Sequence, residues 1–196
     1  VYDVAKLLDN LFRGDRRIGN DEEFSKKVVL VDENEMTAVM MGFPTLKGLS
    51  RETPSTYVSV LLNQTAALHY IDVAQEFGLA GDVCPMPEAE LGVSIDDDAP
   101  ILGACAVQCN TTCDGSLLSN GGIAKRMELE DGIPIFQLAS PMLHREYDVQ
   151  DYAAQEIKNC IAFIEEKTGE KWDWDYYFEC AKRVNESTRH RMEWLD

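Results

Sequence analysis

Positive charge is scarce in this sequence, which has 18 lysines and arginines against 35 aspartates and glutamates and a net charge of −17 over 196 residues. Such an acidic chain binds the phosphates of nucleic acids poorly, and anionic membrane surfaces are disfavoured for the same reason. The acidic residues are spread along the chain, which is typical of a solvated surface. We therefore expect neither a nucleic acid nor a membrane as a partner.

Long hydrophobic runs and export signals are also missing. No apolar run approaches the roughly 20 residues that a membrane-spanning helix needs, and no signal peptide is visible. These absences predict a cytoplasmic protein, and disulfides are rare in that compartment. The chain starts at Val1 without an initiator methionine, which suggests a processed, truncated or incompletely represented chain.

Several ligand-binding motifs are absent as well. The G-x-G-x-x-G loop of dinucleotide-binding proteins does not occur. Three adjacent aspartates at residues 96–98 lack the alternating spacing of an EF-hand calcium loop, so we interpret them as a solvated turn. Cys105, Cys109 and Cys113 are separated by three residues each, which is not a zinc or ferredoxin signature.

The residues that are present indicate a globular α/β protein. Hydrophobic residues make up 45% of the chain, enough for one core and at most two small domains. Residues 27–31 form a β-branched run that predicts a buried strand, and residues 100–107 and 132–138 predict two more. A helix over residues 115–130 lies between the last two, which gives the strand–helix–strand order of a parallel sheet.

Apolar residues at helical spacing predict the remaining elements. A helical segment at residues 1–26 precedes a sheet domain at residues 27–147, and a second helical segment occupies residues 148–196. Within the sheet domain we expect further helices over residues 36–41, 53–77 and 88–92. An aromatic group in the last segment, which packing on the domain explains best, consists of Trp172, Trp174, Tyr176 and Tyr177.

The six cysteines are the least ordinary feature, and four of them lie in the central stretch. Cys105, Cys160 and Cys180 have surroundings that suit small buried hydrophobes. Cys84 precedes a proline and Cys113 ends a polar loop, so burial explains these two less well. Spacing alone leaves a structural thiol, a disulfide, zinc and another metal centre open. Thiolates in such turns lie near backbone N–H groups that can donate to cluster sulfurs.

Reactive residues also follow the predicted strands. Residues 109–114 come after one strand, and Ser140 and Pro141 come after the next. Functional groups in parallel α/β sheets collect at the carboxyl ends of the strands. We therefore expect both groups at the same edge of the sheet.

Several motifs together resemble the 2-hydroxyacyl-CoA dehydratase family, which also includes subunits of benzoyl-CoA reductase. They occur in the family's order and spacing over most of residues 27–190. The motifs are DVCP at residues 82–85, TCDGS at 112–116, GIPIF at 132–136, Ser140-Pro141, IAFIEEKTGEKWDW at 161–174 and, more loosely, residues 35–44.

The resemblance implies a Rossmann-like (flavodoxin-like) parallel sheet with flanking helices and a C-terminal helical segment that leads to a second domain absent from this chain. It also implies a heterodimer with a related subunit and a [4Fe–4S] cluster held by three cysteines per subunit. The first two match Cys84 and Cys113, which are therefore the expected metal ligands and catalytic residues. The third has no match here. Either the chain is the N-terminal half of a longer subunit, or Cys109, Cys105 or a non-protein ligand completes the set.

The activity implied by the resemblance is elimination of water from a 2-hydroxyacyl-CoA to give an enoyl-CoA through a ketyl radical. An ATP-dependent activator protein supplies the electron, and the enzyme is sensitive to oxygen. Asp114 would fix the cysteine turn and Ser116 would donate to a cluster sulfur, although both also suit helix capping. The alternatives are an acyl-CoA reductase subunit of the benzoyl-CoA type, a non-catalytic partner subunit and, with least support, a zinc-stabilised binding module.

Overall fold

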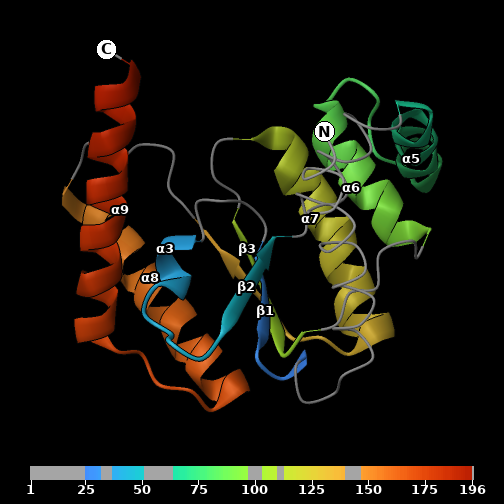
Figure 1. Cartoon of the computed structure of the whole chain (residues 1–196). Helices are drawn as coiled ribbons and strands as arrows, with labels where there is room; N and C mark the ends of the chain where they lie inside the picture. Colours follow the sequence, from blue (N-terminus) through green and yellow to red (C-terminus); the bar gives the residue numbers. More distant parts are fainter. Residues whose placement is uncertain are drawn as a thin grey trace.

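The computed structural model describes residues 25–31, 37–50, 64–96, 103–109, 113–139 and 147–195. Within them a central sheet lies between two layers of helices (Figure 1). Several predicted features lie outside the described residues: residues 1–24 of the helical segment predicted at residues 1–26, the start of the helix at residues 53–63, the strand start at residues 100–102, and Ser140 with Pro141.

Four parallel strands form the sheet. They are β1 (Val28–Val31), β2 (Lys47–Ser50), β3 (Cys105–Cys109) and β4 (Ile135–Leu138). Their order across the sheet is β2-β1-β3-β4, which matches the beginning of the flavodoxin-like order and confirms the expected fold class. The chain crosses to the other side of β1 between β2 and β3, so the carboxyl ends of β1 and β3 flank the topological switch point.

One face of the sheet packs against α8 (Tyr147–Thr168) and the short helix α3 (Thr37–Met40). The core on this side contains Val29, Val107, Cys105, Cys160 and Ile164, all of which are buried. Both central strands, β1 and β3, are buried along their whole length. A helix layer on each face explains the continuous apolar run of β1, because parallel strands are covered on both sides.

The other face packs against α7 (Asp114–Arg126), with α5 (Gln64–Phe77) and α6 (Pro85–Ile95) beyond it (Figure 1). The core of this layer is a second cluster, formed by Val28, Leu30, Ala74, Leu91, Ala106, Ile123, Met127 and Ile133. Successive side chains of a strand point to opposite faces of the sheet. Each central strand therefore contributes alternate residues to the two core clusters.

Some elements differ from their predicted bounds. Helix α6 covers residues 85–95 instead of 88–92, because Pro85 is favourable in the first turn of a helix. The helix predicted to end at residue 130 passes into a π-helical turn, η3 (Met127–Asp131), which stops at Gly132 with φ +67°. Strands β3 and β4 begin later than predicted, at Cys105 and Ile135.

Strand β2 was not predicted. Its sequence, KGLS, contains no β-branched residue, and none of its residues is fully buried. It pairs in register with β1, with Lys47 opposite Val28, and the Lys47 amide donates to the Lys27 carbonyl at 2.8 Å. Backbone pairing with β1 forms this edge strand, and side-chain preference contributes little.

The last helix, α9 (Trp174–Leu195), contains no buried residue. A tight loop before it anchors it to the sheet layer, because the Asp173 amide donates to the Gly42 carbonyl at 2.8 Å. Trp172 packs edge-on against Phe43, with ring centroids 5.3 Å apart. The expected packing of this aromatic group on the domain therefore holds for Trp172, whereas Trp174 stays 58% exposed. Among the described residues, no helix has the length and apolar character to cross a membrane.

Candidate functional site

Cys84 occupies the N-terminal cap of α6 and is exposed. Its backbone is extended, with φ −64° and ψ 130°, as expected for a residue that precedes proline. Its carbonyl accepts the Glu88 amide at 3.5 Å, which closes the first helical turn. The prolines that follow thus fix the cysteine at the tip of a helix, outside the hydrophobic core.

Cys113 occupies the equivalent place on α7 and is half-buried. Its Sγ accepts the backbone N–H of Ser116 at 3.4 Å, so the thiol itself caps the helix. The Cys113 carbonyl accepts the Leu117 amide at 3.1 Å. Both candidate ligands therefore stand where helices begin, beside backbone N–H groups that have no partner within the helix.

Gly115 is where the first turn of α7 meets Cys84. A Cβ at this position would lie 3.5 Å from the Cys84 Cβ and 3.4 Å from the Cys84 amide nitrogen. It would also lie 2.9 Å from Cγ of Pro87, closer than real Cβ contacts allow. The first turn of α7 therefore lies directly against Cys84, and only glycine permits this approach.

The two helix N-termini give this place a definite electrostatic character. A helix N-terminus carries a partial positive charge and directs N–H groups outwards, which favours anions and thiolates. The N-termini of α6 and α7 meet at the position of Gly115, so their effects act on one small volume. The arrangement can hold a negatively charged, sulfur-ligated group.

The two remaining predicted site residues are placed less completely. Ser116 lies within the first turn of α7, and its backbone N–H donates to a sulfur. The expectation concerned donation to a cluster sulfur, which remains a prediction. Asp114 is the first residue of α7, but its side chain lies outside the described part of the structure, so its role also remains a prediction.

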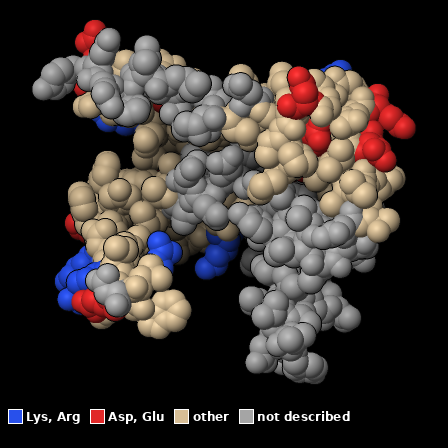
Figure 2. Space-filling view, turned by 90° about the horizontal axis from the view of Figure 1, so that it is seen from above, with Lys and Arg blue, Asp and Glu red and all other residues tan. Residues whose placement is uncertain are grey.

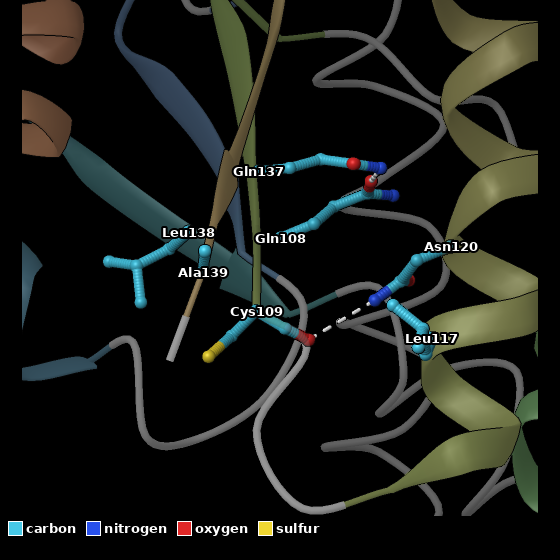
Figure 3. A pocket seen from close by; sticks show the side chains of 7 residues that line it. All are labelled: Gln108, Cys109, Leu117, Asn120, Gln137, Leu138 and Ala139. Atoms are coloured by element: carbon cyan, nitrogen blue, oxygen red, sulfur yellow. Dashed lines mark hydrogen bonds between the residues drawn. The ribbon is translucent and has the colours of Figure 1, made fainter. Parts of the chain in front are cut away.

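Cys105 and Cys109 lie on a different side of the sheet from this site. They alternate along β3 with Ala106 and Gln108, and both belong to the core cluster that packs against α8. Figure 3 shows the Cys109 sulfur pointing away from the side that faces α7. The pleat of β3 therefore directs these thiols away from Cys84 and Cys113, which argues against them as completing ligands.

Burial also raises the pKa of the thiols between the sheet and α8. It raises the pKa of Cys105 from 9.0 to about 12, although the charge of Lys167 acts in the opposite direction. Burial likewise raises the pKa of Cys160 to about 12, and the neighbouring Cys105 and Cys109 add to this effect. These cysteines behave as small hydrophobes, as the sequence indicated.

A complete metal site is not formed by the described residues. Within them, no group of three or more histidine, cysteine, aspartate or glutamate side chains is arranged to hold a metal ion. Within the described residues, Cys84 and Cys113 are therefore not part of a three-ligand group.

A separate pocket of about 150 Å³ lies between α7 and the ends of β3 and β4 (Figure 3). Three carboxamide side chains reach towards it, one from each element. The Gln137 Nε2 donates to the Gln108 Oε1 at 3.2 Å, and the Asn120 Nδ2 donates to the Cys109 carbonyl at 3.2 Å. Its lining residues are Gln108, Cys109, Leu117, Asn120, Gln137, Leu138 and Ala139.

Sequence reasoning missed this pocket, although one signal was present. Gln108 is a polar residue within a strand that is buried on both faces, and its side chain is only 1% exposed. A buried amide in a central strand needs polar partners, which places other polar groups around it. Its printed partner, Gln137, comes from another strand and could not be assigned from sequence spacing.

Charged side chains are distributed unevenly over the surface of the molecule. Seen from above, acidic side chains gather on the right of the molecule, over α5 and α6, whereas basic side chains lie mainly on the left (Figure 2). The exposed acidic residues on that side include Asp72, Glu76, Asp82 and Asp96. The outer surface of α5 and the C-terminal end of α6 are therefore negatively charged.

Comparison with known proteins adds one finding. The sequence model of one protein family, described as 2-hydroxyglutaryl-CoA dehydratase, D-component, matches residues 36–196. The matched region includes every described element except β1 and contains both Cys84 and Cys113. A search of curated proteins finds no match.

Proposed function

This chain belongs to the family of 2-hydroxyglutaryl-CoA dehydratase D-components, and we propose that it is a subunit of an oxygen-sensitive iron–sulfur 2-hydroxyacyl-CoA dehydratase. The enzyme would remove water from a 2-hydroxyacyl-CoA and release an enoyl-CoA. A related second subunit would pair with this chain, and an ATP-dependent activator would provide one electron. The substrate's acyl group stays open.

The observation that carries this proposal is the contact of Gly115 with Cys84. It places the cap of α6 beside the first turn of α7, whose own cap is Cys113. Two cysteines far apart in the sequence thus cap two helices whose first turns pack together. Neither thiol belongs to the hydrophobic core, so a structural role explains them poorly.

These residues fit an iron–sulfur cluster in their donor chemistry. Thiolates are the usual ligands of such clusters, and nearby N–H donors adjust the reduction potential. The half-buried Cys113 already receives one such N–H bond, from Ser116. When bound, the cluster would supply one-electron chemistry and an iron able to polarise a substrate oxygen.

The chain's own contribution in this proposal is binding and orientation. Cys84 and Cys113 would hold the group where the first turn of α7 packs against Cys84 at Gly115. The N-termini of α6 and α7 stabilise its negative charge. Asp114, at the start of α7, would set the geometry of the cysteine turn, and Ser116 would donate a hydrogen bond to sulfur.

A non-catalytic partner subunit is the alternative that one observation favours. The described residues lack a group of three ligands for a metal, and such a subunit would need no complete set. In this case the chain would support an active sister subunit. A benzoyl-CoA-type reductase is less well supported, because the matching family is described as a dehydratase.

The test is to measure iron, acid-labile sulfide and zinc per chain after anaerobic purification with the co-expressed second subunit. We expect about four irons and four sulfides, and loss of most of the iron in Cys84→Ser and Cys113→Ser. Cys180→Ser is the matched control, because Cys180 is a partly exposed free thiol on α9. Zinc alone, or unchanged iron in both variants, would contradict the cluster assignment.

Product analysis separates the alternatives. An enoyl-CoA formed without net consumption of reductant supports dehydration, whereas stoichiometric reductant use indicates a reductase. If Cys113→Ser assembles normally and leaves turnover unchanged, the non-catalytic role replaces the proposal.

A further inference from the structure

Helix α9 carries large apolar side chains that are open to solvent. None of its 22 residues is buried. Phe178 is 62% exposed near its beginning, and Met192 is 56% exposed near its end. Helices in proteins are stabilised mainly by the packing of an apolar face and much less by intrinsic propensity. A long helix that leaves such a face open is therefore expected to pack against a further surface.

The apolar residues form a seam on one side of α9. Positions along it alternate between four and three residues apart, which is the spacing of a helix pair. The opposite side carries ion pairs within the helix, because Glu179 pairs with Arg183, and His190 pairs with Glu193 at 3.2 Å. The seam consists of Trp174, Phe178, Ala181, Asn185, Thr188, Met192 and Leu195.

The first two turns of α9 lie beside the body of the protein, and the rest of the helix projects from it. Tyr177, Cys180 and Ala181 are half-buried, whereas every residue from 182 to 195 is exposed. Figure 1 shows the C-terminal end of α9 extending beyond the sheet. A second helix can therefore lie along the seam without displacing the domain.

Helix α9 is electrically balanced in a strongly acidic chain. Helix α8, of the same length, has two basic and five acidic residues, and the whole chain has a net charge of −17. Two copies of such a chain repel each other, and the repulsion is smallest where two charge-balanced helices meet. The charged residues of α9 are four basic ones, Lys182, Arg183, Arg189 and Arg191, and four acidic ones, Asp175, Glu179, Glu186 and Glu193.

We propose that α9 is a self-association surface on which the α9 helix of a second copy of this chain packs in antiparallel orientation. The pair has a two-fold axis, so each contact occurs twice. The inference goes beyond the proposed function, since it requires neither a cluster nor the related subunit. Asn185 and Thr188 interrupt the apolar seam, and polar residues at such positions fix the register at a cost in stability. The dimer is therefore concentration-dependent, and on dilution α9 is open to solvent.

The two ends of α9 complement each other, which favours the antiparallel orientation. In a pair centred at the level of residue 183, Asp175 in the first turn of one copy lies beside Arg189 of the other. The aromatic ring of Trp174 then packs against Met192 of the second copy. Opposite ends of the two helix dipoles also come together. A parallel pair would instead place the acidic first turns side by side.

The first experiment measures the mass of the full chain by sedimentation equilibrium over a range of concentrations, with a thiol reductant present. We expect the mass to rise from that of one chain towards twice that value. Met192→Glu places a charge in the seam and should weaken dimerisation about tenfold or more. Trp194→Glu is the matched control, because residues two apart point to different sides of a helix and Trp194 is 83% exposed.

The control should dimerise as the parent does, and circular dichroism should show that both variants keep their helix content. A monomer at every concentration, or equal weakening by both substitutions, overturns the proposal. If the parent is a monomer and Met192→Glu instead blocks assembly with the related second subunit, the seam belongs to that subunit and self-association is wrong.

A charge exchange tests the orientation. Asp175→Arg and Arg189→Asp should each weaken the dimer several-fold, because each single change places like charges side by side twice. The double variant restores opposite charges and should recover most of the parental affinity. In a parallel pair these two positions lie at different heights and do not meet. Unchanged affinity in the single variants, or no recovery in the double variant, overturns the antiparallel arrangement.

Discussion

At the residue scale, the candidate site depends on a glycine at position 115. Gly115 has no Cβ, and the first turn of α7 consequently reaches Cys84 and Pro87. Gly121, further along the same helix, has nothing within 4 Å of the equivalent position. One helix thus contains a glycine that the packing requires and a glycine that it does not.

Gly115→Ala tests this difference. The added methyl overlaps Pro87, so we expect a loss of about 1–3 kcal/mol in the free energy of unfolding and a lower iron content. Gly121→Ala is the control and should be neutral or more stable by up to about 1 kcal/mol, because alanine favours the helix. Urea denaturation and metal analysis give both values. Equal stability of the two variants would show that α7 does not press against Cys84.

A second residue-scale prediction concerns the buried thiols of Cys105 on β3 and Cys160 on α8. Burial raises the pKa of Cys105 and of Cys160 from 9.0 to about 12. Below pH 9 both states keep the thiol proton, but between pH 9 and about 12 only the folded chain keeps it. Stability should therefore fall as pH rises through this window, by about 1.4 kcal/mol per pH unit for each thiol.

Urea titrations between pH 8 and pH 10 measure this slope. Cys160→Ala should reduce it relative to the parent, although the substitution also lowers stability at neutral pH by leaving a cavity. Cys180→Ala, on the exposed helix α9, should keep the parental slope. A parental slope in Cys160→Ala would mean that this thiol is not the source.

At the element scale, one carboxylate joins α8 to α9. Glu165 accepts the Trp172 backbone N–H at 2.9 Å through Oε1 and the Lys171 ammonium at 2.9 Å through Oε2. These bonds, first that of Trp172, lower the pKa of Glu165 below 4.5. Its contribution to stability is complete above that pH and is lost as pH falls through the lowered value.

We predict that acid loosens the turn between these helices through this group. Tryptophan fluorescence should change below pH 4.5 in the parent, and Glu165→Gln should flatten that change because the amide does not titrate. Glu166→Gln is the matched control, since Glu166 is exposed and pairs only with Lys167 among the described residues. An identical acid response in Glu165→Gln would assign the change elsewhere.

The helix α8 and the strand β2 differ in whether local sequence or contacts with a neighbouring strand determine them. The apolar spacing of Ile157, Cys160, Ile161 and Ile164 predicted α8, and Cys160 and Ile164 do face the sheet. Strand β2 has no such pattern, because an edge strand is defined by the backbone groups of its neighbour. Local sequence therefore determined α8, and pairing with β1 determined β2.

At the scale of the whole molecule, burial is unequal between the layers. Strands β1 and β3 are fully buried, α8 contributes Cys160 and Ile164 to the core, and α9 contributes no buried residue. Local opening costs little free energy where few contacts are broken.

We therefore predict a gradient of hydrogen exchange. Amides of β1 and β3 should exchange most slowly, those of α8 at an intermediate rate and those of α9 fastest, as measured by mass spectrometry on the isolated chain. Trp194, 83% exposed near the end of α9, should lie in the fastest peptide. Protection of α9 equal to that of α8 would show that another surface covers it in solution.

The sequence by itself determined the α/β class, the parallel arrangement and the family, because apolar periodicity and short motifs are local properties. It also predicted Cys84 and Cys113 as candidate ligands through the resemblance to that family. Only the tertiary structure showed that the first turn of α7, which Cys113 caps, packs against Cys84, that the pleat of β3 turns Cys105 and Cys109 towards α8, and that three amides line one pocket. Each of these is a contact between residues distant in the chain, and such contacts arise only when helices and strands pack.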